Sequence, residues 1–119
     1  MLSLPAEIYL CTLPTDMRKS FDGLMRMVEE HIQKNVLDGG LFAFINKRQD
    51  RIKLIYWDRD GLAIWYKRLE KGTFQKLPSK NGHHIRLTAT DLALLLDGID
   101  LSRVVRRKRY KISEKLSKN

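Results

Sequence analysis

Apolar and polar residues alternate most clearly in the centre of the chain, over residues 41–74. Three runs rich in β-branched and aromatic residues lie there, separated by polar breaks at 46–50 and 58–61. This pattern predicts three antiparallel strands joined by two tight turns. The second break, DRDG, suits a type I turn followed by a bulge, in which Gly61 takes the left-handed conformation.

That turn places Asp58 opposite Leu62, and this register divides the strand residues between two faces. One face is almost entirely apolar and is expected to be buried. The other carries cations together with both tryptophans of the chain: Arg51, Lys53, Ile55, Trp57, Ala63, Trp65 and Lys67. Cations contact phosphates and aromatic rings stack on bases, so this face is a candidate nucleic-acid platform, and Lys47, Arg48 and Arg68 are further candidate contacts. Alternatively, a second layer covers the tryptophans and the cations reach past them to solvent.

Two helices are predicted, one before and one after these strands. The first covers residues 17–32, where apolar residues recur every three or four positions: Met17, Phe21, Leu24, Val28 and Ile32. Its competing N-caps, Thr15, Asp16 and Ser20, leave two starting points open. The second covers 88–97, and Thr88 with Asp91 resembles a capping box at its start. Further short strands are predicted at 7–12, 73–77 and 84–87. The expected fold class is therefore α+β, an antiparallel sheet of about four to six strands with both helices packed on it.

Basic residues are concentrated at the C-terminal end of the chain. The chain has 119 residues and a net charge of +9, and residues 103–119 hold eight of its 23 lysines and arginines against one of its 14 acids. We therefore expect one domain over residues 1–102, followed by a basic tail over 103–119. Such a tail predicts an anionic partner, nucleic acid before a membrane surface, and its candidate contacts are Arg103, Arg106, Arg107, Lys108, Arg109 and Lys111. A solubilising tail without a fixed partner is the alternative.

Several classes of protein are disfavoured by what the sequence lacks. No apolar run is long enough for a membrane span, and the N-terminal segment lacks the features of a signal peptide, which together favour the cytoplasm. Cys11 is the only cysteine, so neither an intrachain disulfide nor a cysteine-based zinc site is expected. His83 and His84 with His31 are a poor metal set, and no motif for a cofactor is present. We expect neither a metal nor a cofactor.

A group of charged residues surrounds the start of the first predicted helix: Asp16, Arg18, Lys19 and Asp22. Backbone N–H groups at a helix start, together with cations, can bind a phosphate. The favoured interpretation is simpler, in which the acids cap the helix and the cations remain solvated. A nuclease hypothesis would use the acids of this group and of the turns, namely Asp16, Asp22, Asp50, Asp58 and Asp60. Turn and cap chemistry already explains most of these acids.

The longest motifs of the chain resemble those of one family. Residues 14–24 (PTDMRKSFDGL) resemble the opening signature of the TnpB-type accessory proteins of the insertion sequence sixty-six family. The run over 46–58, the segment 60–74 with its WYKRLE motif, and the closing segment 94–100 (LLLDGID) resemble the central and final motifs of that family. The resemblance covers residues 7–101, and nothing is carried over from it to the basic end.

This resemblance implies a small bacterial protein encoded in a mobile element beside a separate transposase, which cuts and joins the DNA. Such proteins are needed for efficient transposition and are distinct from the RNA-guided nucleases that share the TnpB name. The first hypothesis is a non-catalytic accessory factor that binds DNA at the element ends and helps to assemble the transposase, with a homodimer as one possible form. The second is an adaptor that binds the transposase without touching DNA, with Trp57 and Trp65 as interface anchors. An enzyme is the least favoured hypothesis.

Overall fold

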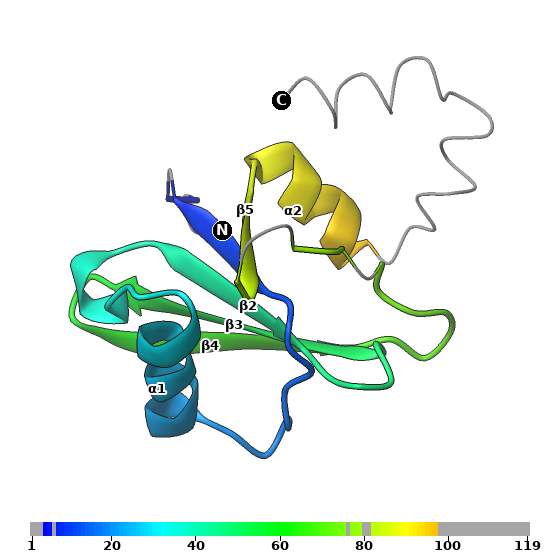
Figure 1. Ribbon diagram of the computed structural model, residues 1–119, viewed down its shortest axis with the longest axis horizontal. Helices are drawn as coiled ribbons and strands as arrows, with labels where there is room; N and C mark the ends of the chain where they lie inside the picture. The colour runs from blue at the N-terminus through cyan, green and yellow to red at the C-terminus, as the bar shows by residue number, and fades with distance from the viewer. Residues whose placement is uncertain (1–3, 6, 76, 80–81, 98–119) are drawn as a thin grey trace.

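Figure 1 shows the computed structural model of the protein, which describes residues 4–5, 7–75, 77–79 and 82–97. Within these residues the chain forms a mixed β-sheet with a helix on each face. The predicted basic tail, residues 103–119, lies outside the described residues together with its six candidate cations.

The sheet has five strands in the order β4-β3-β2-β1-β5. These strands are β1 (Ile8–Cys11), β2 (Leu41–Ile45), β3 (Arg51–Asp58), β4 (Gly61–Arg68) and β5 (His84–Leu87). The pair β1–β2 is parallel and the other neighbouring pairs are antiparallel, so the α+β prediction is confirmed with one parallel pair added. The first helix (Phe21–His31) follows β1 in the chain and returns it to the end of the sheet where β1 starts. The next strand, β2, therefore runs in the same direction as β1. A short 3-10 helix, Val36–Asp38, precedes β2.

The two helices cover opposite faces of the sheet (Figure 1). Helix α1 (Phe21–His31) buries its apolar stripe, including Leu24 and Val28, against one of them. Helix α2 (Ala89–Leu96) buries residues such as Leu92 against the other. We call these two surfaces of the sheet the α1 face and the α2 face.

The helix predictions are confirmed in kind, but α1 is shorter than predicted. It begins at Phe21 after the N-cap Ser20, which is the later of the two starts that the sequence left open. Carbonyls of the preceding loop accept hydrogen bonds from Lys53 instead of helical N–H groups. The capping box of α2 is confirmed. Thr88 Oγ1 accepts a hydrogen bond from the Asp91 N–H, and Asp91 Oδ2 accepts one from the Thr88 N–H, each at 3.0 Å.

The predicted strand at 73–77 is wrong, because the described residues of this segment lie against the core without joining the sheet. Phe74 is fully buried, and its N–H donates to the Gln49 carbonyl at 2.6 Å. Gln49 Nε2 donates in turn to the Phe74 carbonyl at 3.0 Å. Phe74 is therefore apolar because its side chain is buried in the core, and not because it belongs to a strand.

The hairpin between β3 and β4 differs from the predicted turn by one residue. Arg59, at φ 58°, takes the left-handed conformation that was expected of Gly61. Asp58 consequently pairs with Gly61 and not with Leu62, which leaves a loop of only two residues. Because side chains alternate along a strand, every residue of β4 lies on the face opposite to the predicted one.

The corrected register separates the two tryptophans that were predicted to share a face. Trp57 lies on the α1 face and pairs with Leu62, whereas Trp65 lies on the α2 face and pairs with Leu54. Lys67 moves with Trp65 to the α2 face. The prediction of a single platform is therefore wrong, although its β3 members remain together on the α1 face.

Candidate nucleic-acid interface

Cations gather on the α1 face where the loop before α1, the turn after β2, the start of β3 and the end of β4 meet. Arg51 and Arg68 are directly opposite each other in the ladder, so their side chains share this face. A shallow groove of about 350 Å³ joins Arg51 to residues of the loop and the turn: Thr15, Asp16, Met17, Asn46, Lys47, Arg48 and Asp50. We define the basic cluster as Arg18, Lys47, Arg48, Arg51 and Arg68.

One side chain, Asn46, holds the turn between β2 and β3. Its Oδ1 accepts hydrogen bonds from the N–H groups of Asp50 and Arg51, each at 3.0 Å, and its Nδ2 donates to Asp50 Oδ1 at 2.7 Å. The bond from Asn46 also lowers the pKa of Asp50, because it favours the charged form of this carboxylate. Lys47 and Arg48 are exposed on this fixed turn. The turn therefore presents two cations to solvent from a defined position.

Acidic neighbours partly cancel the charge of three arginines in the basic cluster. The ion pairs are Arg18–Asp16 at 2.7 Å, Arg68–Glu70 at 2.7 Å and Arg48–Asp50 at 4.0 Å. Among the ion pairs of the described residues, none involves Lys47 or Arg51. The charge of these two residues is therefore uncompensated in the sense that no ion pair of the described residues involves them, although the charge of Arg51 also helps to lower the pKa of nearby Asp50.

Tyr66 places an exposed aromatic ring beside the basic cluster. The residue is 46% exposed, and Arg51 Nη1 donates to its hydroxyl at 3.0 Å. Lys53 Nζ lies 4.8 Å from the ring centroid on the same face. The predicted register had assigned Tyr66 to the buried face. A register with a two-residue loop, in which Asp58 pairs with Gly61, would have placed Tyr66 on the face of Arg51. Nucleic-acid bases stack on exposed aromatic rings that lie beside cations.

Two lysines that were predicted to contact nucleic acid are engaged within the fold. Lys53 is only 9% exposed, and its Nζ donates to the carbonyls of Met17 and Lys19, both at 2.8 Å. Lys67 Nζ donates to the Leu96 carbonyl at 2.7 Å, at the C-terminal end of α2, where a cation stabilises the helix. Lys53 therefore anchors the loop before α1, and Lys67 anchors α2.

Both tryptophans are exposed, but neither lies in the basic cluster. Trp57 lies at the end of β3 away from Arg51, on the same face. Trp65 borders an apolar hollow of about 460 Å³ on the α2 face, which is lined by Leu4, Leu41, Leu54, Tyr56, Leu92, Ala93 and Leu96. The two rings therefore belong to two separate surfaces.

The polar residues before α1 mostly bind one another. Asp16 Oδ2 accepts from Arg18 Nη2 at 2.7 Å, and its Oδ1 accepts from the Arg18 N–H at 2.9 Å. These bonds from Arg18 lower the pKa of Asp16 to about 2, so the pair is charged at neutral pH. Asp22 lies in the first turn of α1, where a negative charge is favourable, and Lys19 offers its carbonyl to Lys53. No side chain caps α1 by a hydrogen bond, so only part of the capping interpretation holds: Asp22 lies where its charge is favourable, and Arg18 is exposed.

Histidines that are distant in the sequence meet at the end of α1. The rings of His31 and His83 are 5.7 Å apart, and His84 Nδ1 lies 3.0 Å from the His31 carbonyl oxygen. In the part of the chain that the structure describes, no group of three or more His, Cys, Asp or Glu side chains is placed to hold a metal ion. None of the described helices has the length and apolar character needed to span a membrane.

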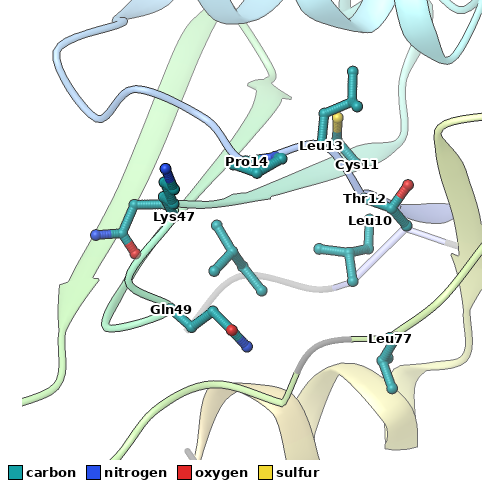
Figure 2. Close-up of a pocket in the computed structure, with 10 residues that line it drawn as sticks. Leu10, Cys11, Thr12, Leu13, Pro14, Lys47, Gln49 and Leu77 are labelled. Atoms are coloured by element: carbon teal, nitrogen blue, oxygen red, sulfur yellow. The ribbon is translucent and has the colours of Figure 1, made fainter.

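A small pocket lies between the end of β1, the turn after β2 and Leu77 (Figure 2). Its volume of about 40 Å³ holds no more than a few water molecules. Cys11 borders it and is buried, and this burial raises the pKa of its thiol. The pocket is therefore too small for an organic ligand, and the thiol is protonated and unreactive at neutral pH.

The sequence matches the family described as IS66 Orf2 like protein over residues 6–106. The chain belongs to this family. Two proteins of Sinorhizobium fredii are similar to it. Uncharacterized protein y4jC is 35% identical over 101 residues, which cover 85% of this chain and 86% of the relative, and uncharacterized protein y4hO is 38% identical over 94 residues, which cover 79% and 81%. No solved structure matches.

Membership of the IS66 Orf2-like family confirms the resemblance that the sequence motifs indicated. The family consists of accessory, non-catalytic proteins associated with transposition. The match extends beyond the described domain to include Arg103 and Arg106 of the basic end.

Proposed function

We propose that this IS66 Orf2-like protein binds DNA through the basic cluster and Tyr66, and so helps to assemble the transposase on the ends of its element. The observation that carries the proposal is the groove that the uncompensated cations Lys47 and Arg51 share, with the exposed ring of Tyr66 hydrogen-bonded to Arg51. The family's association with transposition supports DNA and the transposase of the same element as partners. The cytoplasm is the proposed place of action.

In this proposal the contacts are mainly to the DNA backbone. Lys47 and Arg51 contact phosphates, and Tyr66 stacks on a base or a sugar. The other arginines of the basic cluster contribute less, because carboxylates lie beside them. Binding of this kind depends strongly on salt, because each phosphate contact releases counterions. It depends only weakly on the DNA sequence, because phosphates are the same in every sequence.

The basic tail is the second part of the proposed interface. We propose that residues 1–102 form the domain and that residues 103–119 add phosphate contacts to those of the basic cluster. The tail carries eight lysines and arginines against one acid, so its attraction to DNA is electrostatic and long in range at low salt. The cluster then fixes the orientation of the domain on DNA that the tail has already attracted.

Fluorescence anisotropy with labelled element-end DNA and scrambled DNA tests this function. Full-length protein is expected to bind both DNAs at low salt, and its affinity should fall steeply between low and physiological salt. A chain that ends at Ser102 should bind more weakly but keep any preference for the element ends. An affinity that does not change with salt, or an absence of binding at physiological salt, would contradict the proposal.

The adaptor hypothesis keeps one specific observation in its favour. Trp57 is 41% exposed and pairs with the partly exposed Leu62, at the end of the α1 face away from the basic cluster. Exposed aromatic residues often concentrate the energy of protein–protein binding. A Trp57→Ala protein that retains its DNA affinity but loses the transposase in a pull-down would support an adaptor surface there. Retention of both partners would exclude that role for Trp57.

A further inference from the structure

Strand β4 forms one edge of the sheet, and nothing in the described part of the chain pairs with its outer side. It is long for an edge strand, because eight consecutive residues pair with β3 without interruption and none is a proline. The opposite edge, β5, has only four residues. Proteins usually protect an exposed edge by shortness, proline, a bulge or charge, since open backbone groups invite another strand. Of these devices β4 has only Lys67 and Arg68, both at one end.

The open backbone groups on this edge belong to alternate residues. The Leu69 N–H donates to the Asp50 carbonyl at 2.7 Å, so the N–H groups of the odd-numbered residues of β4 also point toward β3. The N–H and C=O groups that point outward are therefore those of Leu62, Ile64, Tyr66 and Arg68. These groups can form a ladder with a further extended strand.

The side chains along the free edge are apolar or aromatic over most of its length. Trp65 is 39% exposed on the α2 face, and Tyr66 is 46% exposed on the α1 face. Leu62, Ala63 and Ile64 are partly exposed. A strand that pairs with β4 would therefore gain cross-strand apolar contacts as well as backbone hydrogen bonds.

We propose that this strand is supplied by a second copy of the chain, which pairs antiparallel with β4 about a two-fold axis at Ile64. A two-fold axis must bring outward-facing residues opposite outward-facing residues. Two positions of the axis, at Ile64 and at Trp65, satisfy this condition and pair all but one residue of the strand.

Size and charge favour the axis at Ile64. In that register Trp65 lies opposite the partner's Ala63, so a large side chain meets a small one. Arg68 lies at the level of the partner's Asp60, an exposed residue of the loop before β4 that forms no ion pair among the described residues, so the acid would join the exposed pair of Arg68 with Glu70. An axis at Trp65 would instead place Arg68 opposite an apolar residue and the two indole rings against each other. The same hairpin thus provides both the cation, at the end of β4, and the acid, in the loop before it, which favours a second copy over an unrelated peptide.

This pairing extends one sheet through both copies. Residues that lie directly opposite in an antiparallel pair point to the same side, so the two α1 faces lie on one side of the dimer. The two Arg68 residues stand roughly 27 Å apart along the strands, which corresponds to eight positions of about 3.4 Å each. The dimer itself does not require DNA. One duplex lying across both basic clusters is a consequence that rests on the proposed function.

Disulfide trapping of the full chain tests the pairing and its register together. Ala63 and the partner's Trp65 form a non-hydrogen-bonded pair in the proposed register, with Cα atoms about 4.5 Å apart, within reach of a disulfide. Ala63→Cys protein mixed with Trp65→Cys protein is expected to form a linked heterodimer in oxidised glutathione. Neither variant alone should form a cross-link. In this register each introduced cysteine lies two positions along the strand from the residue opposite the same cysteine in the partner. The native Cys11 is buried and gives no background.

Sedimentation velocity of the unmodified protein, without DNA, provides the second measurement, and a dimer is expected. A cross-link in Trp65→Cys protein alone would place the axis at Trp65 and overturn the proposed register. A monomer over the whole accessible concentration range, with no cross-link in the mixture, would overturn the dimer. Because neither measurement involves DNA, failure of the dimer and failure of DNA binding are distinguishable.

Discussion

Replacing Lys53 with methionine is expected to lower the free energy of unfolding by about 2–4 kcal/mol. The substitution keeps the apolar stem and removes only the ammonium group, which donates to the carbonyls of Met17 and Lys19. Both carbonyls then lose a charged donor beneath the loop that leads into α1, and leaving such groups unsatisfied costs more than a typical hydrogen bond contributes. Urea denaturation of the full chain measures the difference.

Lys47→Met is the matched control for Lys53, since Lys47 is exposed and forms no ion pair among the described residues. Its effect on stability should stay within about 0.5 kcal/mol. The same pair separates folding from binding, because Lys47→Met should weaken DNA binding whereas folded Lys53→Met protein should retain it. Equal stabilities of the two variants would show that Lys53 does not anchor the loop.

Phe74→Ala is expected to lower the free energy of unfolding by about 3–5 kcal/mol. Phe74 lies in no helix or strand, yet its ring is fully buried in the cluster that joins the sheet to α2. Removing the ring loses its transfer free energy and leaves a cavity between the sheet and α2. It also weakens the attachment of this segment to the turn at Gln49, which is held by two hydrogen bonds.

Phe21→Ala provides the comparison for Phe74, since it removes the same ring from a position that is 42% exposed at the start of α1. Its cost should be well below that of Phe74→Ala in the same urea denaturation experiment, because part of the ring is already in water. If the two substitutions cost the same, the segment around Phe74 is not part of the core.

Strong local signals allowed most of the fold to be predicted. The apolar stripe of α1, the capping box of α2 and the central strands all follow from residue patterns that act within a few positions. The parallel pairing of β1 with β2 could not be predicted in this way, because it depends on where α1 returns the chain. Likewise, the buried Phe74 resembled a strand residue, since burial alone produces the same apolar signal.

The candidate site was predicted only in part, and one turn accounts for most of the difference. Gly61 was the obvious residue for the left-handed conformation, but Arg59 adopts it, and this moved Trp65 and Lys67 to the other face. Lys47 and Arg51 were selected for their charge and remain available on the surface. Lys53 was selected by the same rule, and only the three-dimensional contact with the loop before α1 reveals its structural role.

The salt dependence of DNA affinity in two charge-matched double variants tests the central claim most directly. Lys47→Ala/Arg51→Ala removes the uncompensated charge of the basic cluster, whereas Arg26→Ala/Arg86→Ala removes the same charge from α1 and β5, at exposed residues that form no ion pair among the described residues. The first variant is expected to reduce the slope of log affinity against log salt by about 0.9 for each lost phosphate contact, while the control keeps the slope of the unmodified protein. Equal slopes for the two variants would contradict the account, because net charge alone would then explain the binding.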